Sequence, residues 1–190
     1  MLLSVFAFAL AAPPTPQAVS LFATPEALAA GEPTAVIRAG VRVAEGTFGF
    51  WGLAGSIPVA HLALRPKDAR VYGQVYAFEA DGVTWLNPDR PIVSFWNDFG
   101  AVTRVGDAAV AERLECYWVQ DNVESGHEHC DLVVELVDAS RWTTTRVDRW
   151  NLPAILSDAP ALAEEFDAAR PKDTRTVRRY LVRYLAERSG

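Results

Sequence analysis

Two cysteines, Cys116 and Cys130, constrain the fold of this chain more than any other feature, and the chain has no others. Each lies in a run of strand-forming residues, 113–121 and 129–137, and the polar residues between these runs are typical of a turn. The composition therefore predicts a β-hairpin. If its loop centres on Val123, the two cysteines lie directly opposite each other, at a separation that a disulfide tolerates. A bridge closing about 15 residues would stabilise the fold by roughly 3 kcal/mol.

The same register sorts the side chains of the hairpin onto two faces, because strand residues alternate with a period of two. The first face, expected to pack on the core, consists of Leu114, Cys116, Trp118, Cys130, Leu132, Val134 and Leu136. The second, expected to lie in solvent, consists of Glu115, Tyr117, His129, Asp131 and Glu135. Glu115 and Asp131 are opposite each other in this register. Such a like-charge pair is unfavourable unless it is solvated or coordinates a ligand.

Short extended runs separated by Gly, Pro and Asp fill most of the chain before residue 150. Besides the cysteine hairpin, they cover residues 35–43, 56–64, 69–78, 83–86, 92–96, 101–105 and 141–147. Runs spaced in this way predict an antiparallel β-sandwich or a partly open barrel. Two amphipathic helices follow, one expected to begin at Asp158 and one over residues 174–188. The fold class is therefore α+β and mainly β.

The length of 190 residues fits one domain. The sequence predicts a signal-peptide-like segment over residues 1–12, a linker with a short helix over 13–34, and a single globular domain over 35–190. That domain is expected to be β-rich over 35–150 and helical over 153–188. The short helix is indicated by Thr24 as N-cap, Pro25 in the first turn and Gly31 as a stop.

Residues 2–12 form an apolar run with the length of a signal-peptide core, too short to span a bilayer. Ala9 and Ala11 supply the small-x-small pattern that signal peptidase accepts, although no Lys or Arg precedes the run. This segment, together with a disulfide, favours a periplasmic or secreted protein. The alternative is an ordinary buried segment.

The net charge is −6 and the isoelectric point is near 5.1, which argues against a nucleic-acid partner. Residues 170–190 nevertheless carry +5, so the other 169 residues carry −11. Arg175, Arg179 and Arg183 share one face of the last predicted helix. That face could contact an anionic membrane surface or an acidic partner. The alternative is a helix that covers the sheet and turns its arginines to water.

His127 and His129 point the same way on a strand, and the predicted register adds Glu115 and Asp131 to that face. Two imidazoles with a carboxylate could hold zinc or copper. A His-x-His pattern has low specificity, and the alternative is a solvated polar face without a cofactor. The third histidine, His61, is far away in sequence.

Residues 94–100 concentrate aromatic side chains around a few polar ones, so Trp96, Asn97 and Asp98 could line a ligand cleft. A strand end with a turn would have the same composition. The chain contains no nucleophile elbow, P-loop or dinucleotide fingerprint. The favoured function is therefore an exported, non-enzymatic domain that binds a small ligand or an envelope protein. The alternative is a metal-dependent, hydrolase-like enzyme that uses the face of His127 and His129.

Overall fold

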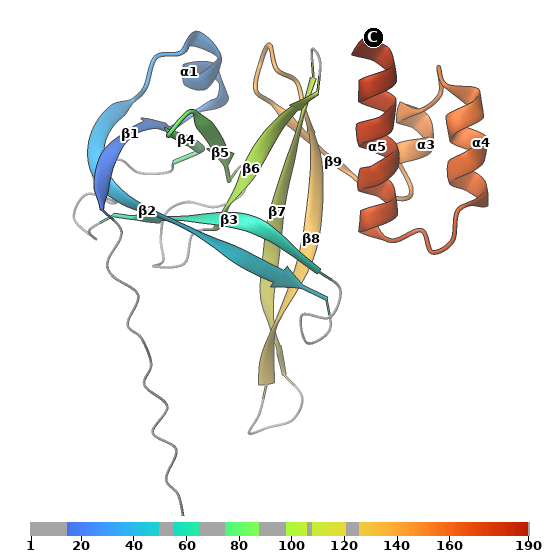
Figure 1. Cartoon of the computed structure of the whole chain (residues 1–190), viewed down its shortest axis with the longest axis horizontal. Helices are drawn as coiled ribbons and strands as arrows, with labels where there is room; N and C mark the ends of the chain where they lie inside the picture. Colours follow the sequence, from blue (N-terminus) through green and yellow to red (C-terminus); the bar gives the residue numbers. More distant parts are fainter. Residues whose placement is uncertain are drawn as a thin grey trace, which may run out of the picture.

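The computed structural model describes residues 15–49, 55–64, 75–87, 98–105, 108–120 and 126–189. Within these ranges a strand ring, a strand meander and a group of helices lie side by side (Figure 1). The strands are β1 (Pro16–Phe22), β2 (Ala35–Phe48), β3 (Gly55–Ala63), β4 (Ala77–Ala80), β5 (Val83–Leu86), β6 (Asp98–Val105), β7 (Ala108–Gln120), β8 (Gly126–Val137) and β9 (Thr144–Val147). The helices are α1 (Pro25–Ala30), α3 (Leu152–Ile155), α4 (Pro160–Ala168) and α5 (Thr174–Ser189).

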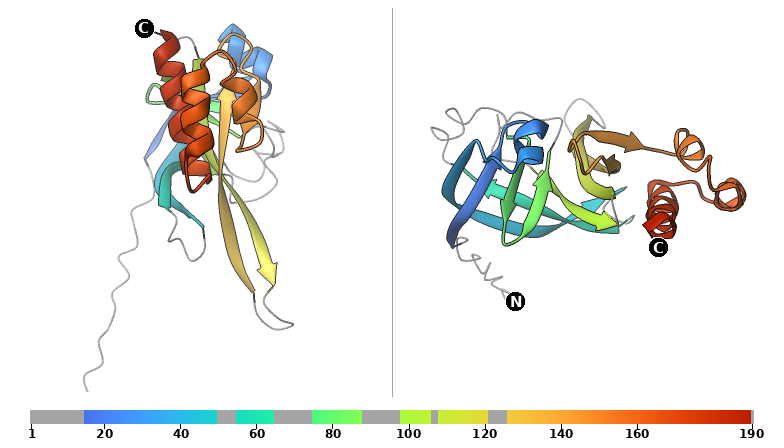
Figure 2. Two further views of the ribbon diagram at one scale, coloured as in Figure 1. Left: turned by 90° about the vertical axis from the view of Figure 1, so that its right-hand side faces the viewer. Right: turned by 90° about the horizontal axis from the view of Figure 1, so that it is seen from above.

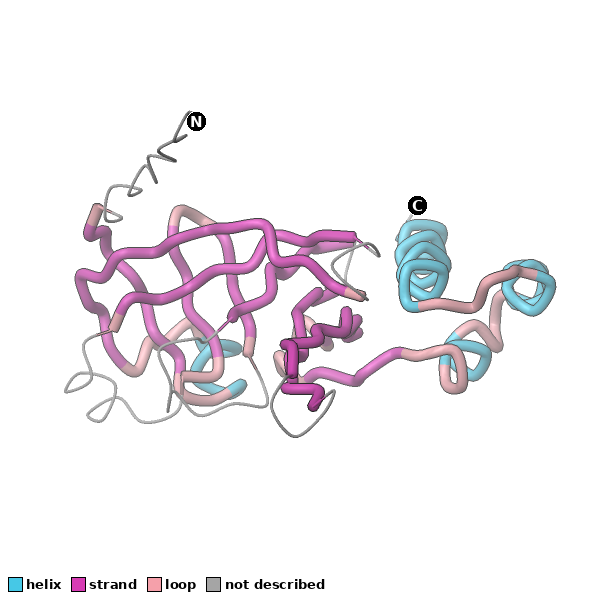
Figure 3. The backbone as a smooth tube through the Cα atoms, turned by 90° about the horizontal axis from the view of Figure 1, so that it is seen from below, coloured by secondary structure: helices cyan, strands magenta, loops and turns pink. Residues whose placement is uncertain are grey.

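Strands β1 to β6 form a barrel-like ring in which each neighbouring pair is antiparallel (Figure 3). The order around the ring is β4-β1-β2-β3-β6-β5, and β3 closes it through the pairs Val59–Gly100, Ala60–Phe99 and His61–Asp98. The part β4-β1-β2-β3 has the spatial order of a Greek key. Closure matters because a ring pairs the edges that an open sheet would expose.

The inside of the ring is packed with apolar side chains. Phe78 lies at its centre, with its ring centroid 4.8 Å from that of Phe99 and 6.2 Å from that of Trp85. Val19, Leu21, Ala39, Ala60, Val75 and Ala80 complete this buried cluster. Small barrels are commonly filled in this way rather than hollow. The described part of the ring is therefore a structural core.

Strand β6 parts from β3 after Gly100. Residues 98–100 pair with β3, whereas from Ala101 to Val105 the strand pairs with β7. A Cβ atom at Gly100 would overlap the main-chain carbonyl of Glu112 in β7. Because only glycine tolerates so close a backbone approach, this residue permits the branch from the ring into the β6–β9 meander.

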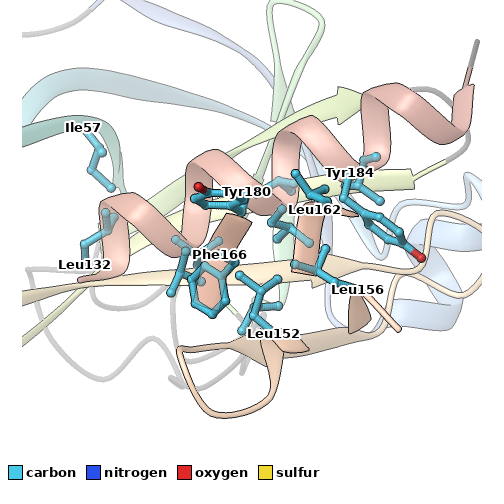
Figure 4. Packing of buried hydrophobic residues seen from close by; sticks show 14 of the residues in the cluster. Ile57, Leu132, Leu152, Leu156, Leu162, Phe166, Tyr180 and Tyr184 are labelled. Atoms are coloured by element: carbon cyan, nitrogen blue, oxygen red, sulfur yellow. The ribbon is translucent and has the colours of Figure 1, made fainter. Parts of the chain in front are cut away.

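The helices cover one face of the meander and bury the largest of the three hydrophobic clusters formed by the described residues (Figure 4). Val177, Leu181 and Leu185 of α5 meet Leu132 and Val134 of β8 in this cluster. Its other fully buried members include Leu152, Leu156 and Phe166. The apolar stripe that the sequence predicts for residues 174–188 is thus the packing face of α5.

Ion pairs and a hydrogen bond fix α5 to its neighbours. Arg178 binds the Glu112 carboxylate of β7 with two nitrogens, one of them at 3.0 Å. Arg183 binds Glu165 of α4. The hydroxyl of Tyr184 donates to Asp158 at 2.8 Å. These contacts link the basic C-terminal segment to acidic residues elsewhere in the chain.

The predicted fold class is confirmed. Of the two predicted architectures, a β-sandwich and a partly open barrel, the ring of strands corresponds to the barrel. The predicted short helix is also confirmed. Thr24 Oγ1 accepts the Ala27 N–H at 3.2 Å, and Gly31 ends α1 in the left-handed conformation at φ 67°. The interpretation of residues 13–34 as a linker is wrong, because β1 lies there and pairs with both β2 and β4.

Both predicted C-terminal helices are present as α4 and α5, preceded by the single turn of α3. Asp158 does not cap α4 as expected. The N-cap is Ala159, which makes no side-chain cap hydrogen bond, and Asp158 accepts from Tyr184 instead.

The signal-peptide-like residues 1–12 lie outside the described residues. In the part of the chain that is described, none of the helices has the length and apolar character needed to cross a membrane.

Candidate functional site

The hairpin of β7 and β8 extends beyond the ring and the helices as a free-standing arm (Figure 2). We use "arm" for residues 115–120 and 126–131. The whole predicted register is confirmed, from Ala109–Val137 to Gln120–Gly126. Near its base the arm is tied to β2, because the Gly49 N–H donates to the Cys130 carbonyl at 2.9 Å.

The disulfide is confirmed at the predicted position. Cys116 and Cys130 face each other across the strands, with an S–S distance of 2.05 Å and a Cα–Cα distance of 4.0 Å. Both side chains are half-buried and pack against the core beneath the helices. The bridge therefore lies where the arm leaves the body, and it holds the two strands together at that point.

Three of the side chains predicted for the polar face come together on the arm. Asp131 accepts from the Tyr117 hydroxyl at 3.2 Å, and its other oxygen lies 3.2 Å from His129 Nε2. The rings of Tyr117 and His129 are directly opposite each other, with centroids 5.3 Å apart. The cluster is at the surface, since Tyr117 is 48% exposed.

The charges around this cluster explain how the like-charge pair of Glu115 and Asp131 is tolerated. Arg146 of β9 donates to Glu115 at 3.0 Å, so each carboxylate has its own partner. Desolvation by the surrounding chain raises the pKa of the Tyr117 phenol. The charge and hydrogen bond of Asp131 raise that pKa further, as does the charge of Glu115.

The predicted metal ligands are not assembled as one group. Among the described residues, the metal-ligand atoms that lie within 4.8 Å of one another belong to Cys116, Glu128 and Cys130. Both sulfur atoms of that group are already bonded to each other. His129 is oriented by Asp131, whereas His127 lies opposite Val119, nearer the tip of the arm.

Trp118 and Glu135 of the hairpin differ in burial from what the sequence predicts. Trp118 shares a face with the cysteines but is 69% exposed, because the arm extends past the core at that point. Its indole lies against Gly126, where a Cβ atom would overlap the ring. Glu135, expected in solvent, is buried beside Arg113, because the other face of β7 and β8 packs on Tyr76, Leu86 and Trp142.

The predicted cleft cannot be assembled from the described residues, since Trp96 and Asn97 lie outside them. Asp98 is the first residue of β6 and pairs with His61 of β3. The third histidine of the chain is thus part of the ring closure.

The predicted basic face of α5 is engaged within the molecule. Arg183 bonds to Glu165 and Glu187, Arg175 lies over the ring of Phe48 at 5.6 Å, and Arg179 lies over that of Tyr180 at 5.1 Å. Of these contacts, only the carboxylates of Glu165 and Glu187 offset positive charge, and they do so at Arg183.

A concave site that sequence reasoning missed lies between the start of α3 and the end of α4. It has a volume of about 550 Å³ and is lined by Arg149, Trp150, Pro153, Asp167, Arg170 and Lys172. The only sequence signal for it is a Trp beside an Arg just before a helix. The two halves of the site are 14 residues or more apart in the chain, so their meeting depends on the helix packing.

No family model matches the chain, and no curated protein or solved structure matches it either.

Proposed function

We propose that this chain is an exported, non-enzymatic binding domain that recognises a partner protein of the cell envelope with its arm. The observation that carries the proposal is the exposure of Trp118 beyond the disulfide. A tryptophan can bury a large apolar area on binding, and aromatic residues are enriched at the centres of protein interfaces.

The arm has a second aromatic side chain on its opposite face, Tyr117. Two aromatic residues on a hairpin braced by a covalent bond lose little conformational entropy on binding, which favours affinity. The apolar run at residues 2–12 and the disulfide are consistent with the oxidising compartment that the proposal requires.

The charge of the arm narrows the class of partner. The arm and the sequence between its strands, residues 115–131, contain five acids and neither Lys nor Arg. Opposite potentials steer association and exclude wrong partners, so the complementary surface is basic with an apolar pocket for the indole. An anionic lipid surface or a nucleic acid would be repelled by this arm.

The test is site-specific photo-crosslinking in cells that export the full chain. A photoreactive phenylalanine at position 118 is expected to give one discrete adduct with an envelope protein. The matched control is position 36, because Val36 of β2 is also an exposed apolar residue, 64% accessible, on a different part of the molecule. Adducts at position 36 with the same pattern, or none at position 118, would refute the proposal.

A second variant distinguishes the contribution of the rigid arm from that of the Trp118 side chain. Replacing both cysteines by serine keeps Trp118 but removes the brace, so the adduct at position 118 should decrease strongly. An adduct of unchanged yield would show that the braced geometry is not what the partner recognises.

The alternative function, a metal-dependent hydrolase, is favoured by one observation. The hydrogen bond in which Asp131 accepts from the His129 ring is the kind that orients a metal-binding imidazole. The other expected ligands are not grouped with it, and we regard the binding function as better supported.

A further inference from the structure

The cavity between α3 and α4 is built on rigid supports. Asp148 Oδ1 accepts the main-chain N–H groups of Trp150 and Asn151 at 2.7 and 3.0 Å, and Asn151 Oδ1 accepts the Asp148 N–H at 2.8 Å. These reciprocal bonds fix the turn that presents Arg149 and Trp150. Leu152 directly follows this turn, and its fully buried side chain anchors α3 in the core.

The opposite wall is equally well supported. Phe166 is fully buried, and its ring packs edge-on against Tyr180 with centroids 5.3 Å apart. Arg170 donates to the main-chain carbonyls of Asp167 and Ala169 with a single nitrogen, Nη1. Lys172 bonds to Asp167 at 2.8 Å, and the hydrogen bond and charge of Lys172 lower the pKa of that carboxyl.

The lining of the cavity defines the ligand chemistry. Three cations face one carboxylate, so the site has a net positive charge. Trp150 is 76% exposed, and the guanidinium of Arg149 lies over its ring at 4.6 Å. Four of the six lining residues are charged, and most of the lining surface is nevertheless apolar. A ligand for this site therefore combines an anionic group with an apolar face that can stack on an indole.

We propose that this cavity binds an anionic pyranose, with the sugar ring stacked on Trp150 and the anionic group bound by Arg170 and Lys172. The C–H groups of a pyranose face supply the stacking surface, and its hydroxyl groups suit the polar rim. Guanidinium groups bind carboxylate and phosphate equally well in a forked geometry. The site is separate from the arm and does not depend on the function proposed for it.

Saturation-transfer NMR on the full chain tests the proposal with two anionic sugars, glucuronic acid and glucose 6-phosphate. Glucose and the methyl ester of glucuronic acid are the neutral controls. We expect saturation of the ring protons of at least one anionic sugar, and a dissociation constant about fivefold or more below that for glucose. The comparison of the two acids identifies a carboxylate or a phosphate as the preferred group.

Three variants locate the binding. Trp150→Ala should weaken it by about tenfold, as loss of a stacking platform does. Arg170→Gln should abolish the preference for anionic over neutral sugars. Trp118→Ala removes an exposed tryptophan on the arm, far from the cavity in sequence, and should leave the binding of sugars unchanged. All three side chains are exposed, and unchanged thermal unfolding verifies that each variant folds. Absence of binding by both anionic sugars, equal binding of glucose, or equal binding by Trp150→Ala would each overturn the proposal.

Discussion

Arg113 and Glu135 form an ion pair inside the protein, with Nε 3.3 Å from Oε2 and about 5% of either side chain exposed. They lie diagonally across β7 and β8, on the face that continues outward to Tyr117 and His129. One side of the hairpin thus changes from buried to solvent-exposed along its length.

The buried pair predicts a large loss of stability when one partner is removed. Glu135→Ala should lower the free energy of unfolding by about 3–5 kcal/mol, because it leaves a guanidinium in a poorly solvated place. Urea denaturation measures the change. The matched control is Glu115→Ala, which breaks the exposed pair with Arg146 and should lower stability by less than about 1 kcal/mol. Equal effects of the two variants would contradict the prediction.

The disulfide should contribute mainly by restricting the unfolded chain. Replacement of Cys116 and Cys130 by serine is expected to lower the free energy of unfolding by roughly 3 kcal/mol. Reduced wild-type protein should match this variant in a denaturant titration, which makes it the internal control. A double variant as stable as the oxidised protein would show that the bridge adds nothing.

The Tyr117 phenol should titrate at higher pH than an ordinary tyrosine. A raised pKa means that the folded chain retains the proton more strongly than the unfolded chain. The resulting stability is present below the ordinary pKa and is lost as the pH rises through the folded value. Absorbance at the tyrosinate band, measured as the difference from Tyr117→Phe, reports this titration. Asp131→Asn should lower the midpoint, and an unchanged midpoint would rule out the Asp131 contribution.

Untagged protein is expected to contain no stoichiometric zinc or copper, because the predicted ligands do not form one group. Elemental analysis checks this directly. Stoichiometric metal that disappears in the His127→Ala, His129→Ala double variant would instead support the metal-dependent enzyme.

The arm and α1 were predictable from sequence because their signals are local. The facing cysteines and the alternating faces agree on one register, and Thr24 with Gly31 defines both ends of a short helix. Closure of the ring could not be predicted in this way. Strands β3 and β6 pair although more than 35 residues separate the paired positions, and no pattern in either strand specifies its partner. Strand β1 was missed because nothing in its own sequence shows that β2 and β4 complete it.

Burial at the site was equally hard to predict. The alternation of side chains along a strand indicates which residues share a face of the sheet. It does not show how far along the strand that face is covered by the rest of the protein. Glu135 and Trp118 were misplaced for this reason, one where its face is covered and the other where its face is not. The cavity at Trp150 depends on helix packing between segments that carry no shared motif.

If the chain is cleaved near its amino terminus, the position of β1 limits where the cut can fall. Cleavage after Ala11 would leave four residues ahead of Pro16, the first residue with a strand partner. A cut after Phe22, the last residue of β1, would remove the strand partners of both β2 and β4. Each would then display a bare edge that other chains can join, so a protease error of one strand length would turn a closed ring into a seed for aggregation.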